Sequence, residues 1–254
     1  MTMPLSPMMV AALVATGVVS GTIDAIAGGG GLIMLPALIA SGLPPQVVLG
    51  TNKLQSVLGT SVAAWRYHRA GLYTLRDRWL LAVLAFAGAV GGALLVRRID
   101  NHALGLVVPL LLVGIAVYTL VSPRMEDRAG VARVSARGFA PVMGLIGFYD
   151  GFFGPGAGQF YTMGLVGLRG EGLTRATGTT KLVNVASNLG SLVVFWLAGQ
   201  VAVELALVIA VGAMTGAAVG SRLATRHGAR LIRPLLVVIS LALTARLVWN
   251  WFAG

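Results

Sequence analysis

The sequence contains no cysteine and few charged residues. Of its 254 residues, 11% are charged and 57% are hydrophobic, whereas an average soluble domain carries about 25% charged residues. The absence of cysteine excludes disulfides, thiolate metal sites and thiol nucleophiles. His68, His102 and His227 share no ligand-like spacing, so no metal site is expected. With a mean hydropathy of +0.86, the composition is that of a polytopic membrane protein.

Acidic residues are also scarce. Eight aspartates and glutamates stand against 19 lysines and arginines, giving a formal net charge of +11. A soluble protein of this charge could bind nucleic acid, but here the arginines lie mostly between apolar segments, where positive residues report membrane topology. Membrane lipids with anionic headgroups are therefore expected partners and nucleic acid is not. No Ser/His/Asp or paired-carboxylate arrangement is evident, so neither catalytic residues nor a cofactor is expected.

Long apolar runs, in contrast, are abundant. A helix needs about 20 apolar residues to cross a bilayer, and windows near this length recur along the chain. The start of the chain lacks the basic residues of a cleavable signal peptide, so its first apolar segment is expected to remain in the mature protein. An all-α polytopic membrane protein is the predicted fold class. The windows cover roughly residues 8–27, 46–65, 79–97, 102–121, 137–153, 181–199, 201–221 and 231–252.

The chain repeats itself at a nearly constant offset. GTIDAIAGGGG (21–31) is echoed by GFYDGFFGPGA (147–157), with an offset of 150 − 24 = 126. GTNKLQSVLGT (50–60) is echoed by GTTKLVNVASN (178–188), with an offset of 181 − 53 = 128. Ordered matches of this kind indicate a duplicated unit. Two homologous four-segment repeats are predicted, over residues 1–121 and 137–254, with a polar connecting loop at 122–136.

The arginines favour an inverted relation between the two repeats. Suppose that residues 8–41 and 137–168 are Gly-broken hairpins that each enter and leave on one side, which leaves about three spanning helices per repeat. Only Arg97 and Arg98 then lie on one side of the membrane, as the positive-inside rule requires. Eight full spans with parallel repeats would scatter the arginines over both faces. The other side receives Arg66, Arg69, Arg76, Arg78, Arg124, Arg128, Arg133, Arg137, Arg169, Arg175, Arg222, Arg226, Arg230 and Arg233.

Two glycine runs are the first candidate site. Residues 28–31 are all glycine, and GPGAG follows at 154–158; glycine costs about 1 kcal/mol in a helix relative to alanine, so both helices should break. Irregular backbone at membrane depth is tolerated where it lines a cavity, and a restarting helix offers free N–H groups and a positive dipole end to an anion. A glycine-rich packing interface is the alternative. A dinucleotide fingerprint is rejected because no strand precedes the glycines.

Two lysines lie within the apolar segments. A charge at the centre of a membrane helix costs at least about 2.5 kcal/mol, so Lys53 and Lys181 should face a cavity or a partner. Each lysine begins a row of polar residues at helical spacing. Thr60 belongs to the row that begins at Lys53. The full set of predicted anion-binding residues is Gly29, Gly30, Gly31, Asn52, Lys53, Ser56, Gly156, Gly158, Thr180, Lys181, Asn184 and Asn188.

Asp24 and Asp150 lie just before the two glycine runs. One hypothesis is that an aspartate takes up and releases a proton and so couples anion transport to a gradient. The alternative is that Asp24 pairs with Lys53, and Asp150 with Lys181, in buried ion pairs that only fix helix positions.

These motifs resemble a known family. GGGGLIMLPALIASGLPPQVVLGTNKL (28–54) is similar to the first signature of the sulfite exporter family, TauE/SafE, and GFYDGFFGPGAGQFYTMGL (147–165) with RATGTTKLVN (175–184) is similar to the second. The resemblance covers nearly the whole chain. It implies a transporter of sulfite, sulfonates or related organosulfur anions in the bacterial inner membrane.

The leading hypothesis is thus a secondary transporter of a small sulfur-containing oxyanion, sulfite or an organosulfonate, which exports it by alternating access, with proton coupling as a further hypothesis. An anion channel and a non-transporting membrane scaffold or sensor are the alternatives. Small-residue faces at Gly88 and Gly92, and at Gly212, Gly216 and Gly220, are expected to pack helices closely. They also permit a homodimer without requiring one.

Overall fold

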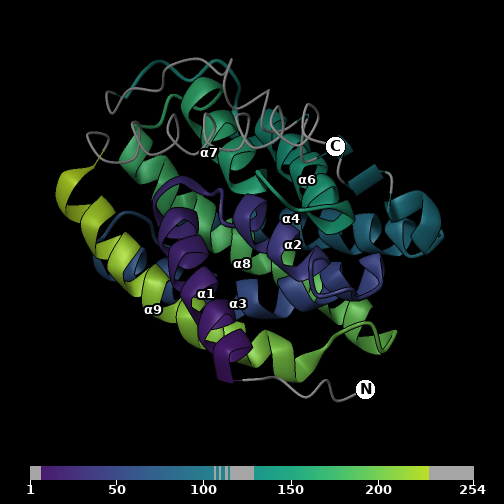
Figure 1. Cartoon of the computed structure of the whole chain (residues 1–254). Coiled ribbons are helices and arrows are strands. Elements are labelled where there is room, and N and C mark those ends of the chain that lie inside the picture. Colours follow the sequence, from purple (N-terminus) through teal and green to yellow (C-terminus); the bar gives the residue numbers. More distant parts are fainter. Residues whose placement is uncertain (1–6, 106, 109, 112–113, 115–128, 229–254) are drawn as a thin grey trace.

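The computed structural model describes residues 7–105, 107–108, 110–111, 114 and 129–228. The regular elements in these ranges are all helices (Figure 1). The predicted span at 231–252 lies outside the described residues, as do residues 122–128 of the predicted connecting loop and much of the span at 102–121. The helices are α1 (Pro7–Ala27), α2 (Gly31–Ile39), α3 (Pro45–Arg69), α4 (Leu75–Val96), α6 (Ala136–Phe152), α7 (Ala157–Gly167), α8 (Leu173–Leu197) and α9 (Val203–His227).

Six of these helices coincide with predicted apolar windows, and α2 and α7 are the short second arms of the predicted hairpins. The largest difference is at α8, which begins at Leu173 rather than at residue 181. Its first two turns, LTRATGTT, are polar, so a search for apolar windows passes over them. They are nevertheless mostly buried, because they pack inside the bundle rather than against lipid.

Four helices are long and apolar enough to cross a membrane: α1, α4, α8 and α9. Helix α3 has the same 25-residue length as α8, and its lower hydropathy comes from a polar stretch that includes Asn52, Lys53 and Gln55. These three side chains are at most 4% exposed. Polar residues in α3 therefore face the protein interior, as expected of polar groups at membrane depth.

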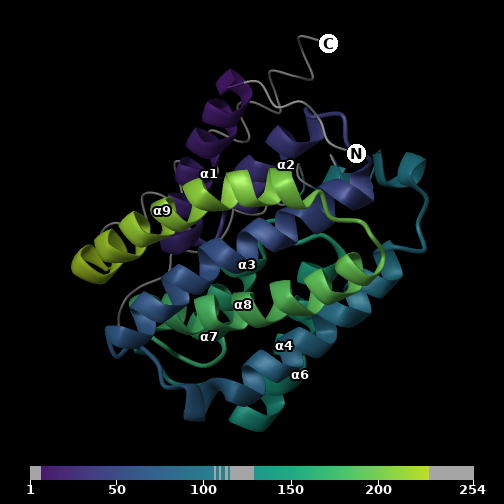
Figure 2. The same ribbon diagram turned by 90° about the horizontal axis from the view of Figure 1, so that it is seen from below.

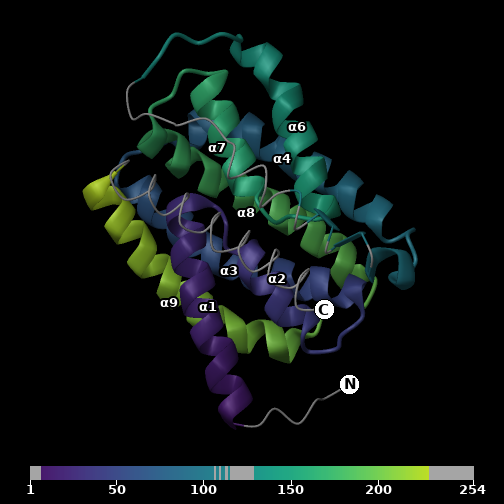
Figure 3. The ribbon, with the colours of Figure 1, turned by 45° about the horizontal axis from the view of Figure 1, so that its top comes forward.

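Helices α3 and α8 form the centre of the bundle and run antiparallel (Figure 2). Near the start of α3, a Cβ placed on Gly50 would lie 2.1 Å from the main-chain oxygen of Gln200, which follows the end of α8. Near the other end, Leu72 and Tyr67 lie against Gly178 in the first turns of α8. The α1–α2 and α6–α7 hairpins lie on opposite sides of this central pair (Figure 3).

The predicted small-residue faces do pack helices closely, and they do so within the chain. A Cβ on Gly212 or Gly216 of α9 would lie 2.1 Å from a main-chain oxygen of α1, and one on Gly88 or Gly92 of α4 would lie 2.1 or 2.0 Å from a main-chain oxygen of α6. Each contact joins a helix of the first predicted repeat to a helix of the second. Because these faces are filled intramolecularly, they lend no support to a homodimer, which stays a prediction.

Candidate functional site

Both helix breaks are present, and they touch each other. Helix α1 ends at Ala27 and α2 begins at Gly31, while α6 ends at Phe152 and α7 begins at Ala157. Gly28 has φ +75°, and a Cβ there would lie 2.7 Å from the main-chain carbon of Gly158. Only glycine fits this left-handed, close-packed position. The breaks of the two hairpins are therefore in backbone contact at the centre of the bundle.

The prediction that these breaks offer free N–H groups is partly wrong. The amide of Leu32 donates to the carbonyl of Gly29 at 3.1 Å, and that of Ile33 donates to Gly30 at 3.0 Å. In the second break, Ala157 N–H donates to the carbonyl of Gly154 at 3.0 Å. Tight turns thus satisfy donors that a regular helix start would leave unpaired. The positive dipole ends of α2 and α7 remain at the centre, where both helices begin.

Both lysines are paired with aspartates, but not with the partners in the sequence-based alternative. Lys53 Nζ donates to Asp150 Oδ1 at 2.7 Å, and Lys181 Nζ donates to Asp24 Oδ2 at 3.1 Å. Each lysine also donates to the main-chain carbonyl of its aspartate. Pairing within each half is therefore wrong: the ion pairs cross between halves, because the antiparallel crossing of α3 and α8 brings each lysine to the opposite break.

Ser187 is a site residue that the sequence analysis missed. Its hydroxyl donates to Asp150 Oδ2, while Lys53 occupies Oδ1, so both carboxylate oxygens of Asp150 have a donor. Gly154 lies beside this pair, and a Cβ there would be 2.8 Å from Lys53 Nζ. The available signal was helical spacing, since Ser187 lies three residues after Asn184 on the polar face of α8.

A cavity of about 30 Å³ lies between the two breaks, with room for about two water molecules. Lys53 lines it, and so do both aspartates and residues from both glycine runs. Asn184 is 5% exposed, and its Oδ1 is buried without a hydrogen-bond partner in the described part of the chain. A buried polar atom in this condition costs free energy unless a ligand or water meets it. The lining is Asp24, Gly28, Gly31, Asn52, Lys53, Ser56, Thr60, Asp150, Gly154, Gly156, Ala157, Gly158, Asn184 and Asn188.

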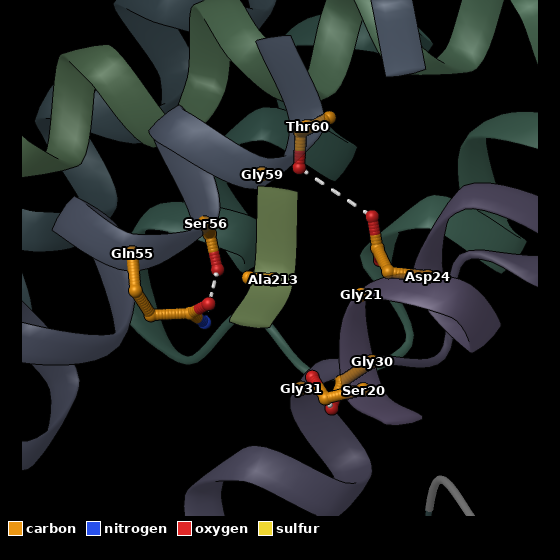
Figure 4. Close-up of a pocket in the computed structure, with 10 residues that line it drawn as sticks. All are labelled: Ser20, Gly21, Asp24, Gly30, Gly31, Gln55, Ser56, Gly59, Thr60 and Ala213. Atoms are coloured by element: carbon orange, nitrogen blue, oxygen red, sulfur yellow. Dashed lines mark hydrogen bonds between the residues drawn. The ribbon is translucent and has the colours of Figure 1, made fainter. Parts of the chain in front are cut away.

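A second cavity of about 20 Å³ adjoins the first and shares Asp24 with it. Figure 4 shows Asp24 and Thr60 pointing toward each other across this space, with Gly59 beside Thr60. The Thr60 hydroxyl donates to Asp24 Oδ2 at 3.4 Å, which is long for a hydrogen bond. The second cavity is lined by Ser20, Gly21, Asp24, Gly30, Gly31, Gln55, Ser56, Gly59, Thr60 and Ala213.

Three residues of the predicted set do not line either cavity. Gly29 lies against the side chain of Gln159. Thr180 is fully buried, with its hydroxyl 2.9 Å from that of Thr162. Lys181 is also fully buried, and it forms an ion pair with Asp24, which lines both cavities. The other nine predicted anion-binding residues line one or both cavities.

A family model for "Sulfite exporter TauE/SafE" matches residues 13–247. The chain belongs to the TauE/SafE family. "Probable membrane transporter protein ORF9" of a Sinorhizobium species is 43% identical over 241 residues, covering 94% of this chain and 92% of the relative. "Probable membrane transporter protein YfcA" of Escherichia coli K12 is 39% identical, covering 96% and 91%. A "Probable membrane transporter protein" of Haemophilus influenzae is 38% identical, covering 96% and 97%.

No solved structure gives a significant match to this TauE/SafE chain. Family membership and the four apolar helices together make it a multi-pass membrane transporter. Its similarity to bacterial proteins agrees with the expected location in a bacterial cell membrane.

Proposed function

We propose that this TauE/SafE transporter exports a small sulfur-containing oxyanion, sulfite or an organosulfonate, through the cavity between the two helix breaks. The observation that carries the proposal is the lining of that cavity. It brings together Lys53, both aspartates, the positive ends of two short helices and the partly unpaired amide of Asn184. Rotating that amide by half a turn would present its N–H groups instead, which suits an oxyanion.

Charge balance links anion binding to a proton. Lys53, Lys181, Asp24 and Asp150 sum to zero formal charge, so an anion entering this buried site would add an uncompensated negative charge, which is costly at membrane depth. Protonation of one aspartate would restore neutrality and release a lysine N–H group toward the anion. We therefore propose that anion and proton bind together, with net export set by the sum of their gradients.

Access would alternate by movement of two inverted halves. Helices α3 and α8 carry the matching motifs of the two predicted repeats, and their antiparallel course supports an inverted relation between the repeats. The position of the two hairpins on opposite sides of α3 and α8 supports the same relation. With room for about two water molecules, the cavity must widen to admit an oxyanion. Because both ion pairs cross between the halves, separating the halves would expose the charged groups to the anion.

Sulfite counterflow in proteoliposomes tests this function. The intact protein should exchange external labelled sulfite for internal sulfite with saturation, and Asn184→Leu should reduce exchange by about tenfold or more, the effect of a lost hydrogen bond to a charged group. Thr180→Val is the matched control: Thr180 lies on the same helix but outside both cavities, so exchange should persist.

The rival functions give different results in the same vesicles. A channel would show potential-driven sulfite flux without counterflow, since exchange requires a binding site that reorients. A scaffold or sensor would show neither sulfite nor alkanesulfonate flux. Either result from stable, correctly inserted protein would contradict the proposal.

A further inference from the structure

The two ion pairs differ in the environment of their carboxylates. The Asp150 side chain is 4% exposed and accepts a hydrogen bond on each oxygen, from Lys53 and from Ser187. The Asp24 side chain is 24% exposed, and its hydrogen bonds from Lys181 and Thr60, of 3.1 and 3.4 Å, both go to Oδ2. Asp150 borders one cavity, whereas Asp24 borders two. The Asp24 carboxylate is thus more accessible and more weakly bonded.

A single repeat position explains much of this difference. The residue equivalent to Ser187 in the first half is Gly59, since 187 − 59 = 128, the offset between the two lysines. Ser187 donates to Asp150. Gly59 has no side chain to offer Asp24; it lies next to Thr60 and lines the same cavity as that aspartate (Figure 4). A glycine in place of a serine leaves both an open space and a missing donor.

From this asymmetry we infer that Asp24 is the proton-carrying carboxylate, that Asp150 is a fixed counterion for Lys53, and that Gly59 keeps Asp24 accessible. The inference rests on the proposed function, because it assigns to one of two equivalent aspartates the proton that accompanies the anion. Each oxygen of Asp150 accepts a hydrogen bond, Oδ1 from Lys53 and Oδ2 from Ser187. Asp24 also receives two such bonds, but both go to Oδ2, and its carboxylate adjoins space for water, through which a proton can reach it.

The groups around Asp24 allow protonation without collapse of the helix crossing. Lys181 of α8 faces Asp24 and keeps its bond to the main-chain carbonyl of that residue when the carboxylate is neutral. Lys53 and Asp150 line the first cavity, which Asp24 also lines. Tyr67 of α3 donates to the neighbouring carbonyl of Ala25 at 2.8 Å. The contributions of α7 and α9 to the two cavities are alanine and glycine, which do not titrate.

Labelling with a hydrophobic carbodiimide tests the assignment independently of transport. This reagent reacts with protonated carboxyl groups at membrane depth and leaves a stable adduct, which peptide mass spectrometry can locate in the sequence. In the intact protein, Asp24 should be labelled, less so as the pH rises, while Asp150 should stay unlabelled. Equal labelling of the two residues, or faster labelling of Asp150, would overturn the inference.

Variants at the two equivalent positions sharpen the test. Gly59→Ser should lower the labelling of Asp24 by about tenfold, because the new hydroxyl favours the charged form. Gly59→Ala is the control: it adds the same Cβ, 3.1 Å from the Cβ of Ala213, without a donor, and labelling should persist. Ser187→Gly should raise the labelling of Asp150. Equal losses in Gly59→Ser and Gly59→Ala would refute the role of the hydroxyl.

Transport separates failure of this inference from failure of the proposed function. If the intact protein shows no sulfite counterflow, the proposed function fails, and labelling still decides which aspartate takes a proton. If counterflow is present in the intact protein, Asp24→Asn should lose the accumulation that a pH gradient drives in the intact protein. Persistence of that accumulation in Asp24→Asn would overturn the inference and leave the transport function intact.

Discussion

The Lys53–Asp150 and Lys181–Asp24 pairs occupy equivalent places in the two halves, yet they are not alike. The first is sealed, with side chains 1% and 4% exposed, and Ser187 completes it. In the second, Asp24 is 24% exposed and the bond to Lys181 is 3.1 Å long. The comparison teaches that two ion pairs at matching sequence positions can differ in exposure and hydrogen bonding, and that the difference coincides with one neighbouring position, Ser187 in one half and Gly59 in the other.

The largest expected effect comes from breaking the sealed pair. Asp150→Asn should lower the free energy of unfolding by about 3–5 kcal/mol, because it leaves the buried charge of Lys53 without a counter-charge. Asp24→Asn should cost less, about 1–3 kcal/mol, because water already reaches that carboxylate. Chemical denaturation in detergent measures both values, and equal losses would contradict the asymmetry. A Lys53→Met/Asp150→Leu double variant should recover much of the lost stability.

The contact between the two breaks gives the next comparison. Gly28 and Gly42 both have φ +75°, but a Cβ on Gly28 would strike Gly158 at 2.7 Å, whereas nothing lies within 4 Å of one on Gly42. Gly42→Ala should lose only the backbone strain, about 1–2 kcal/mol. Gly28→Ala should lose more and abolish sulfite counterflow, because the breaks must move apart. Similar melting temperatures for the two variants would argue against this contact.

Helix packing between the halves gives a smaller effect. On α6, a Cβ on Gly151 would lie 2.0 Å from the main-chain oxygen of Ala89, whereas one on Gly144 would lie 3.8 Å from that of Leu84. Gly151→Ala should therefore destabilise the protein by about 1–3 kcal/mol through overpacking. Gly144→Ala should be neutral or slightly stabilising, since alanine favours helix. Thermal unfolding of the two variants checks this, and a neutral Gly151→Ala would count against the α4–α6 contact.

The smallest effect is expected at a link between the halves near the ends of the helices. Arg78, in the first turn of α4, forms a 2.7 Å ion pair with Glu171, which precedes α8. Glu171→Gln should cost about 1 kcal/mol or less, because partly exposed pairs gain little net free energy. Adding salt should shrink the difference between the variant and the intact protein. A loss that stays constant with salt would mean that Glu171 acts through packing or hydrogen bonding instead.

The sequence was sufficient to predict the elements that depend on local composition. Apolar windows located the long helices, and the glycine runs located both breaks. The partners of the lysines could not be predicted, because they depend on how α3 and α8 cross, which no local pattern encodes. Ser187 was missed since a lone serine in a helix usually bonds its own backbone. The turns that satisfy Leu32 and Ala157 depend on the detailed course of each break, which glycine leaves open.

The central claim, that an oxyanion and a proton share this cavity, is tested most directly by proton uptake during sulfite binding. Calorimetric titration of the purified protein in buffers of different ionisation enthalpy yields the number of protons taken up per anion. Comparing the intact protein with Asp24→Asn in identical titrations cancels the protonation of sulfite itself. The account predicts about one more proton per bound anion in the intact protein. Saturable binding with the same proton uptake in both proteins would contradict it.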